Sequence, residues 1–184
     1  MQDFAGRVAK IEALYLDPIK VKLMDTEEGN GWSRLQCDAA EKWYKRFLVL
    51  NLLYENEAIV PTKEIDEFWH YHILDTEKYA EDCQNTFGYF LHHFPYFGMR
   101  GEEDAKDLER SFARTQELFV HEFGESLSEL RSIFSLGDAE GAAKCDGSHC
   151  GAKDCSKCGK SCSGAKCTPS SRPPGVDYSI RPSL

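Results

Sequence analysis

The sequence predicts an all-α protein, a compact bundle of five or six helices followed by a cysteine-rich tail that is either disordered or ordered by metal. Apolar residues recur at intervals of three and four in several segments before position 136, as on one face of a helix. No segment shows the strand alternation between turn residues that a sheet needs. All aromatic residues except Tyr178 lie at or before position 136. We therefore expect a helical domain at 1–136 and a low-complexity tail at 137–184.

The N-terminal third predicts two helices separated by a loop. A single apolar stripe marks the first helix and consists of Phe4, Val8, Ile11 and Tyr15. Pro18 should end this helix, and residues 20–32 are expected to form a loop. Ser33 and Gln36 have the spacing of a capping box, which should open a long helix that ends near Tyr54. The buried face of that helix should hold Leu35, Ala39, Trp43, Phe47 and Leu50.

In the middle of the chain, the sequence predicts a helix that includes the segment DEFWHYHILDTEKY. Thr62 follows a proline and suits the N-cap of this helix. Asp75 or Thr76 could cap a second, shorter helix that ends at Gly88, or the two could be one kinked helix. Residues 87–101 lack helical order and are too aromatic for solvent, so we expect a loop that lies over the core.

Two further helices complete the expected body. Acidic residues just before Asp104 suit the positive end of a helix that runs to Phe123, with Gly124 as its stop. Ser126 and Glu129 have the spacing of another capping box, which should start a final short helix.

The charge and hydropathy of the chain exclude several classes of protein. Residues before 144 carry a net charge of about −13 and the remainder about +4, so the acidic body argues against binding nucleic acid. No run of about 18 apolar residues exists, which argues against a membrane span. Charges at the N-terminus would interrupt a signal peptide, so a cytoplasmic location is expected. Thiols stay reduced there, and the eight cysteines are better interpreted as metal ligands or reactive groups than as disulfides.

The two histidines of the segment DEFWHYHILDTEKY should point to different sides of their helix. At 100° per residue, His72 falls in the middle of the apolar face, whereas Asp66 and His70 lie side by side at its edge. His70 and His72 are about 200° apart and cannot bind the same ion from a regular helix. His72 is therefore interpreted as a hydrogen-bonded residue of the core.

Asp66 and His70 form the candidate metal site. A carboxylate and an imidazole at this spacing can share a metal ion, or the carboxylate can orient the ring. The missing ligand should come from His92 or His93, which the aromatic loop could bring back over the helix, with His121 as a weaker candidate. We take Asp66, His70 and His93 as ligands of Zn or Fe. The alternative is that His92 and His93 only anchor the loop.

This pattern resembles the glycine-rich domain-containing protein-like family over roughly residues 14–124. In that family an Asp precedes a Trp-His pair, a second His follows, and then come a Tyr, an Asp-Cys pair and a later His. The matching residues here are Asp66, Trp69, His70, His72, Tyr79, Asp82, Cys83 and His93. The resemblance implies a helical domain in which the Asp/His set is a functional unit. It implies no particular reaction.

The tail contains six cysteines within a short lysine-rich segment, namely Cys145, Cys150, Cys155, Cys158, Cys162 and Cys167. Clustered thiolates repel one another unless a soft cation such as Zn(II) or Cu(I) neutralises them, so a metallothionein-like site is expected. His149 could add a nitrogen ligand. The alternatives are an oxidised or merely flexible tail, and a tail whose cysteines a partner enzyme modifies.

These observations favour three functions in order. The first is a metal-binding protein with an Asp/His site in its helical domain and a thiolate-rich tail that captures or delivers a soft metal. The second is a metalloenzyme, in which the Asp/His site holds Zn or Fe while His72 or His92 transfers protons. The third is an interaction scaffold whose histidines are structural and whose tail recruits a protein partner.

Overall fold

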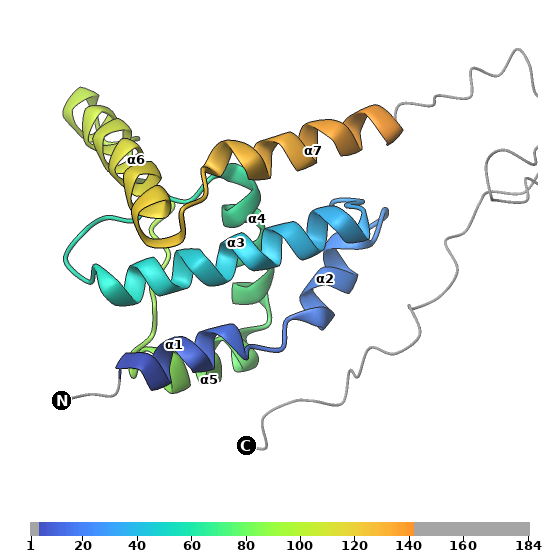
Figure 1. The fold of residues 1–184 in the computed structure, drawn as a ribbon, viewed down its shortest axis with the longest axis horizontal. Coiled ribbons are helices and arrows are strands. Elements are labelled where there is room, and N and C mark those ends of the chain that lie inside the picture. The colour runs from blue at the N-terminus through green and yellow to red at the C-terminus, as the bar shows by residue number, and fades with distance from the viewer. Residues whose placement is uncertain (1–3, 142–184) are drawn as a thin grey trace, which may run out of the picture.

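The computed structural model describes the backbone of residues 4–141 and the side chains of residues 4–135, and these residues form helices and connecting loops without a strand (Figure 1). The helices are α1 (Phe4–Glu12), α2 (Asp17–Met24), α3 (Arg34–Leu53), α4 (Lys63–Leu74), α5 (Thr76–Thr86), α6 (Glu102–Phe123) and α7 (Leu127–Gly141). The all-α prediction is confirmed. The last helix continues past the expected join at 136, and the rest of the tail lies outside the described residues.

Helix α3 runs through the middle of the body and contacts α1, α2, α4, α6 and α7 (Figure 1). Its capping box is present, because Ser33 Oγ accepts from the amide of Gln36 and the Gln36 side chain accepts from the amide of Ser33. The buried stripe includes Trp43, Tyr44 and Phe47. Leu35 was expected in this stripe but is 69% exposed. It lies two positions before buried Cys37, about 200° around the helix and on the opposite face.

Helix α2 is the element that the sequence did not predict. The first helix ends at Glu12, and Pro18 stands in the first turn of α2. Proline is favourable there because the first amides of a helix have no partner within the helix. The expected loop at 20–32 therefore begins only after Met24.

The buried Lys20 of α2 fastens this helix to α3 through ion pairs with Asp38 and Glu41. Its Nζ lies 2.6 Å from Asp17, 3.0 Å from Asp38 and 2.6 Å from Glu41, and the residue is only 5% exposed. Burial alone would lower the pKa of Lys20, but the three carboxylates outweigh it and the pKa lies above its ordinary value. This network explains how a charged residue can occupy the core side of α2.

Helices α4 and α5 are separate, and Asp75 lies between them. The N-cap expected at Thr62 is present, since its hydroxyl accepts from the amide of Ile65 at 3.5 Å. Helix α4 buries Ile65, Phe68, Trp69 and His72 and thereby presents its Asp66 and His70 edge at the surface of the core.

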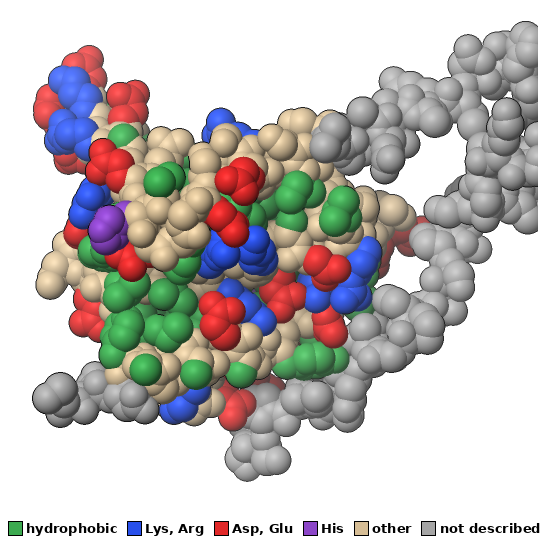
Figure 2. Space-filling view, in the orientation of Figure 1, with side chains coloured by type: hydrophobic (Ala, Val, Ile, Leu, Met, Phe, Trp, Pro, Cys, Tyr) green, Lys and Arg blue, Asp and Glu red, His purple; other side chains and the backbone are tan. Residues whose placement is uncertain are grey.

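Helices α6 and α7 follow the long loop at 87–101, which is non-helical as expected. In α6 the fully buried residues, Thr115, Leu118 and Phe119, lie in its C-terminal half, and the N-terminal half projects from the body (Figure 1). Charged side chains of both signs gather on this projecting end (Figure 2). Gly124 ends the helix in a left-handed conformation, as predicted. None of the described helices has the length and hydropathy needed to cross a bilayer.

Candidate metal site

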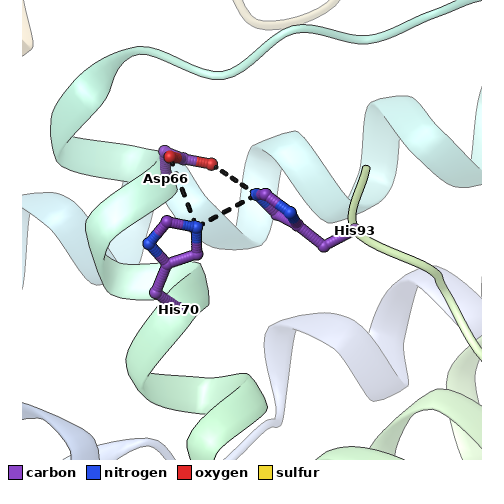
Figure 3. A group of neighbouring side chains, drawn as sticks. All are labelled: Asp66, His70 and His93. Atoms are coloured by element: carbon purple, nitrogen blue, oxygen red, sulfur yellow. Dashed lines mark hydrogen bonds and ion pairs between the residues drawn. The ribbon is translucent and has the colours of Figure 1, made fainter. Parts of the chain in front are cut away.

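Asp66, His70 and His93 converge on one point at the surface of the core (Figure 3). The Nε2 atom of His93 lies 3.0 Å from Asp66 Oδ1 and 3.1 Å from His70 Nε2. The other carboxylate oxygen, Asp66 Oδ2, lies 3.5 Å from His70 Nε2. These residues are the three predicted ligands of the body, and the structure brings them together.

Two elements supply this cluster. Asp66 and His70 are one turn apart on α4, so their side chains lie on the same side of the helix (Figure 3). His93 comes from the loop at 87–101, which returns over α4. The side chain of His70 is 44% exposed, that of Asp66 34% and that of His93 17%. The cluster is therefore accessible to an ion from solvent.

The spacing of the donor atoms suits a small divalent ion. A tetrahedral ion with bonds of about 2.0–2.1 Å separates its ligand atoms by roughly 3.3 Å, and an octahedral ion by roughly 3.0 Å. The observed separations are of this size: 3.1 Å between the two Nε2 atoms, 3.0 Å from His93 to Asp66 Oδ1 and 3.5 Å from His70 to Asp66 Oδ2. Two imidazoles and one carboxylate form the donor set of both catalytic zinc sites and non-haem iron sites.

The start of the loop is anchored by buried hydrogen bonds. Tyr79 on α5 donates from its hydroxyl to the carbonyl of Leu91 at 2.6 Å. The same hydroxyl accepts from Trp69 Nε1 at 2.8 Å. The Trp69 ring also packs against His93, with ring centroids 4.6 Å apart. Tyr79 and Trp69 thus fix the chain two residues before His93 and support its imidazole.

The end of the loop is fastened to α6. Asp104 accepts from the amides of Gly98 at 2.7 Å and Arg100 at 3.1 Å. The guanidinium of Arg100 also pairs with this carboxylate and lowers the pKa of Asp104 to about 2. Gly98 has a φ of 88°, and a Cβ there would lie 2.5 Å from a methyl group of Leu108. Glycine therefore allows the loop to lie directly against α6.

His72 lies in the core, as the helical wheel predicted, and is 1% exposed. Its Nε2 lies 3.0 Å from Asp82 and its Nδ1 lies 2.8 Å from the hydroxyl of Tyr44. Burial raises the pKa of Tyr44 and keeps its phenol protonated, so Tyr44 donates to Nδ1 and the Nε2–H donates to Asp82. Burial also lowers the pKa of His72, although Asp82 opposes this shift. Both ring nitrogens are engaged, and this geometry gives no support to proton transfer by His72.

The sequence did not identify Tyr44 as a partner of His72, and it brought in Asp82 only through a resemblance. Burial opposes ionisation of Asp82, but hydrogen bonds from His72 and Lys78 outweigh it and the pKa lies below its ordinary value. A histidine in the middle of an apolar face requires partners for both nitrogens. That requirement was visible in the sequence, but the identity of the partners depended on how α3 and α5 pack.

The remaining predicted residues are not part of the cluster. His92 is exposed, and its ring lies against Phe90 with centroids 5.0 Å apart. Its proposed role in proton transfer stays a prediction. His121 pairs with Glu122 on α6 at 2.8 Å. The predicted tail ligands Cys145, Cys150, Cys155, Cys158, Cys162 and Cys167 lie outside the described residues.

The family of the chain can be stated from its similarity to known proteins. Residues 7–129 match the model of the UCP032817-like family, and this match covers more than half of the sequence. The chain belongs to the UCP032817-like family. Comparisons with curated proteins and with solved structures found no match. The match includes all three residues of the Asp/His cluster, but the description of the family specifies no activity.

The assignment to the glycine-rich domain-containing protein-like family is wrong. The family model that matches residues 7–129 is the UCP032817-like one. The resemblance depended on a few residues around α4, α5 and the loop, chiefly a Trp-His pair with a second His two residues later. A histidine at the edge of a helix and a buried histidine two residues later can occur in many helical proteins. This pattern therefore does not distinguish one helical family from another.

In this UCP032817-like protein a cleft of about 700 Å³ opens beside the cluster. Asp66, His70 and His93 all line it, together with Trp69 and the exposed His92. The segment at 57–63, the loop residues 92–95 and 97, and Leu108 of α6 form most of its other walls. Its volume lies within the range of about 300–1,000 Å³ that is usual for small-molecule sites. An ion bound by the three ligands would therefore face an open space.

The two cysteines of the body are structural. Cys37 is fully buried and Cys83 is 2% exposed, as expected for small apolar residues. Burial raises the pKa of the Cys37 thiol to about 12 and also raises that of Cys83. Because the thiolate is the nucleophile and the metal ligand, neither cysteine is suited to chemistry near neutral pH.

Replacing Tyr79 by Phe is expected to weaken Zn²⁺ binding about tenfold to a hundredfold, as loss of an outer-shell contact commonly does. The change removes the hydrogen bond to the Leu91 carbonyl and frees the chain that carries His93. Tyr44→Phe is a matched control, because it deletes an equally buried hydroxyl that contacts His72 and not the loop. Competition with a chelating dye measures both affinities, and equal affinities for the two variants would contradict the anchoring role.

Proposed function

We propose that the chain is a metal-binding protein whose helical body holds one divalent ion, Zn²⁺ or Fe²⁺, between Asp66, His70 and His93. The observation that carries this proposal is the convergence of their donor atoms: the Nε2 atoms of His70 and His93 lie 3.1 Å apart, and each lies within 3.5 Å of an oxygen of Asp66. These residues come from a helix and from a loop that is anchored at both ends. The hydrogen bonds that anchor this loop are made by groups other than the three proposed ligands, so they support the site without involving the ion.

A second candidate function is a metalloenzyme, and the cleft favours it. Three protein ligands leave at least one coordination position free for water or substrate, as in catalytic zinc and iron sites. An ion at the cluster would polarise such a ligand or lower the pKa of bound water. His92 lines the same cleft and is the exposed imidazole that could exchange protons there. This function requires a substrate, which metal binding alone does not.

The tail supplies the second part of the proposed function. Its six thiolates, with His149 nearby, have the donor chemistry for a soft ion such as Zn(II) or Cu(I). A reducing compartment such as the cytoplasm would keep them available. We propose that the tail captures or delivers metal, or that it recruits a protein partner, while the Asp/His site retains an ion in the body.

The test is metal analysis of the full chain in which the six tail cysteines are replaced by serine. This variant lacks the proposed thiolate ligands of the tail, so the Asp/His site is the candidate metal site that remains. We expect one Zn²⁺ per chain after loading and desalting, measured by elemental analysis and by calorimetric titration. Binding should weaken at acid pH, because histidine ligands bind metal only in the neutral form.

Two further samples assign the bound ions to the tail or to the Asp/His site. The unaltered chain should bind more than one ion per chain under reducing conditions if the tail is metallated. The serine variant that also carries Asp66→Ala should retain none. A serine variant that retains no ion at neutral pH, while its circular dichroism shows the helical body intact, would overturn the proposed site.

A further inference from the structure

We propose that the cleft beside the Asp/His site binds a small carboxylic acid with an apolar body, whose carboxylate coordinates the ion. This inference rests on the proposed function, because it needs an ion between Asp66, His70 and His93. It goes further by naming the chemical class of the ligand. Three properties of the cleft support it: its charge, its apolar walls, and the fact that all three proposed ligands of the ion line it.

The charge of the metal-loaded cleft favours an anion. A divalent ion bound by one carboxylate and two neutral imidazoles leaves a net charge of about +1. Glu57, which also lines the cleft, is paired with Arg114 at 2.9 Å. Lys63 lines the cleft and is exposed, and among the described residues it makes no ion pair. A neutral or cationic ligand would leave this positive charge without compensation.

The walls of the cleft favour an apolar body on that anion. Most of the remaining lining is apolar and includes Ile59, Val60, Trp69, Phe97 and Leu108. The wall at residues 57–63 is fixed, because the amide of Val60 donates to the buried hydroxyl of Thr115 at 2.9 Å. The opposite wall is the anchored loop. An apolar group between them would remove hydrocarbon from water at about 25 cal/mol per Å².

The position of the ion links these two features. All three of its ligands line the cleft, so the cleft is where a further ligand would approach. The volume of about 700 Å³ leaves room for an organic molecule beside the ion. Carboxylate oxygens are good ligands for both Zn²⁺ and Fe²⁺. A phenyl-bearing carboxylate therefore satisfies the ion and the apolar wall at once.

The experiment uses the full-length chain in which the six tail cysteines are replaced by serine, loaded with Zn²⁺ and titrated with 3-phenylpropanoate in a calorimeter. Two probes separate its features: acetate lacks the apolar body, and 3-phenylpropanamide lacks the charge. We expect 3-phenylpropanoate to bind at least about tenfold more tightly than either probe, and at least about tenfold more tightly than it binds the metal-free chain. Lys63→Ala should weaken its binding severalfold, whereas Lys106→Ala, on the exposed side of α6, should leave it unchanged.

The outcomes separate failure of this inference from failure of the proposed function. Zn²⁺ content is measured first, and a chain with Asp66, His70 and His93 intact that binds no Zn²⁺ at this site would remove the basis of both. If Zn²⁺ binds but 3-phenylpropanoate shows no preference over acetate, the apolar wall is not a binding surface and the inference is overturned. Equal binding of the acid and the amide, or equal binding with and without Zn²⁺, would also overturn it.

Discussion

His93→Ala is expected to lower the affinity of the body for Zn²⁺ by at least about a hundredfold. Outer-shell contacts commonly contribute tenfold to a hundredfold to metal affinity, and His93 is proposed as a direct ligand. The Nε2 atom of His93 lies close to a donor atom of each of the other two proposed ligands, at 3.0 Å from Asp66 Oδ1 and 3.1 Å from His70 Nε2. Without it, two ligands on one helix face must hold the ion alone.

The adjacent residue offers a matched control. His92 has the same side chain and lies in the same loop, but it is exposed and belongs outside the cluster. His92→Ala should therefore change Zn²⁺ affinity by less than about twofold. Both variants are measured by competition with a chelator in the background that lacks the tail cysteines. If the two alanine variants lose affinity equally, the assignment of His93 as the ligand is wrong.

The stability of the variants tells loss of a ligand from loss of the fold. His93 packs against Trp69, so its truncation also removes some apolar contact. We expect this to cost on the order of 1 kcal/mol in the metal-free protein, because the side chain is partly exposed. Thermal unfolding in the presence of a chelator measures that cost. A melting temperature still well above the assay temperature shows that the affinity loss is local.

The helix face could be predicted from the sequence, because a regular helix fixes the relative directions of its side chains. The period of 100° placed Asp66 beside His70 and turned His72 into the core, and both results are confirmed. The same reasoning failed at the start of α3, where Leu35 was expected inside. The buried face of α3 was predicted from apolar residues alone. That prediction was wrong at the first turn because polar Gln36 and small Ala40 occupy buried positions.

The contribution of the loop at 87–101 to the Asp/His cluster could be predicted only in part. The aromatic residues at 87–101 indicated that this segment lies over the core, and its contacts with Tyr79 and Trp69 agree with this. The premise that these aromatics avoid solvent was wrong, because most of them are exposed, namely Tyr89, Phe90, Phe94 and Tyr96. The choice between His92 and His93 depends on the direction of single side chains in an irregular segment. Here that direction is set by the anchor at Leu91 and by the ring of Trp69, two contacts between distant parts of the chain. Local sequence patterns do not encode such contacts, and for the same reason the partners of Lys20 and His72 were missed.

His72→Ala is expected to destabilise the body by about 3–4 kcal/mol, which is the largest loss of stability predicted for a single residue here. The change leaves a cavity and removes the hydrogen bonds that Tyr44 and Asp82 make with the imidazole. Urea unfolding in the presence of a chelator measures the difference. Zn²⁺ affinity at low temperature should change little, because His72 is not part of the Asp66, His70 and His93 cluster.

The pH dependence of stability isolates the titration of His72 from its packing. Its folded pKa lies below the ordinary value of 6.5, so the unfolded chain binds the proton more readily. The stability that His72 contributes is therefore fully present above about pH 6.5 and is lost as the pH falls toward the folded pKa. Asp82 acts in the same direction at lower pH, because its pKa is also lowered from the ordinary 3.8.

His72→Gln keeps a polar side chain at this position but cannot titrate, so it should lack the part of the stability loss that begins below about pH 6.5. The comparison is made on metal-free protein by urea unfolding at pH 7.5, 6.5 and 5.5. The wild-type chain should lose stability more steeply than the variant over this range. Parallel curves would mean that the imidazole is not held neutral between Tyr44 and Asp82, since a group with the same pKa in both states contributes no slope.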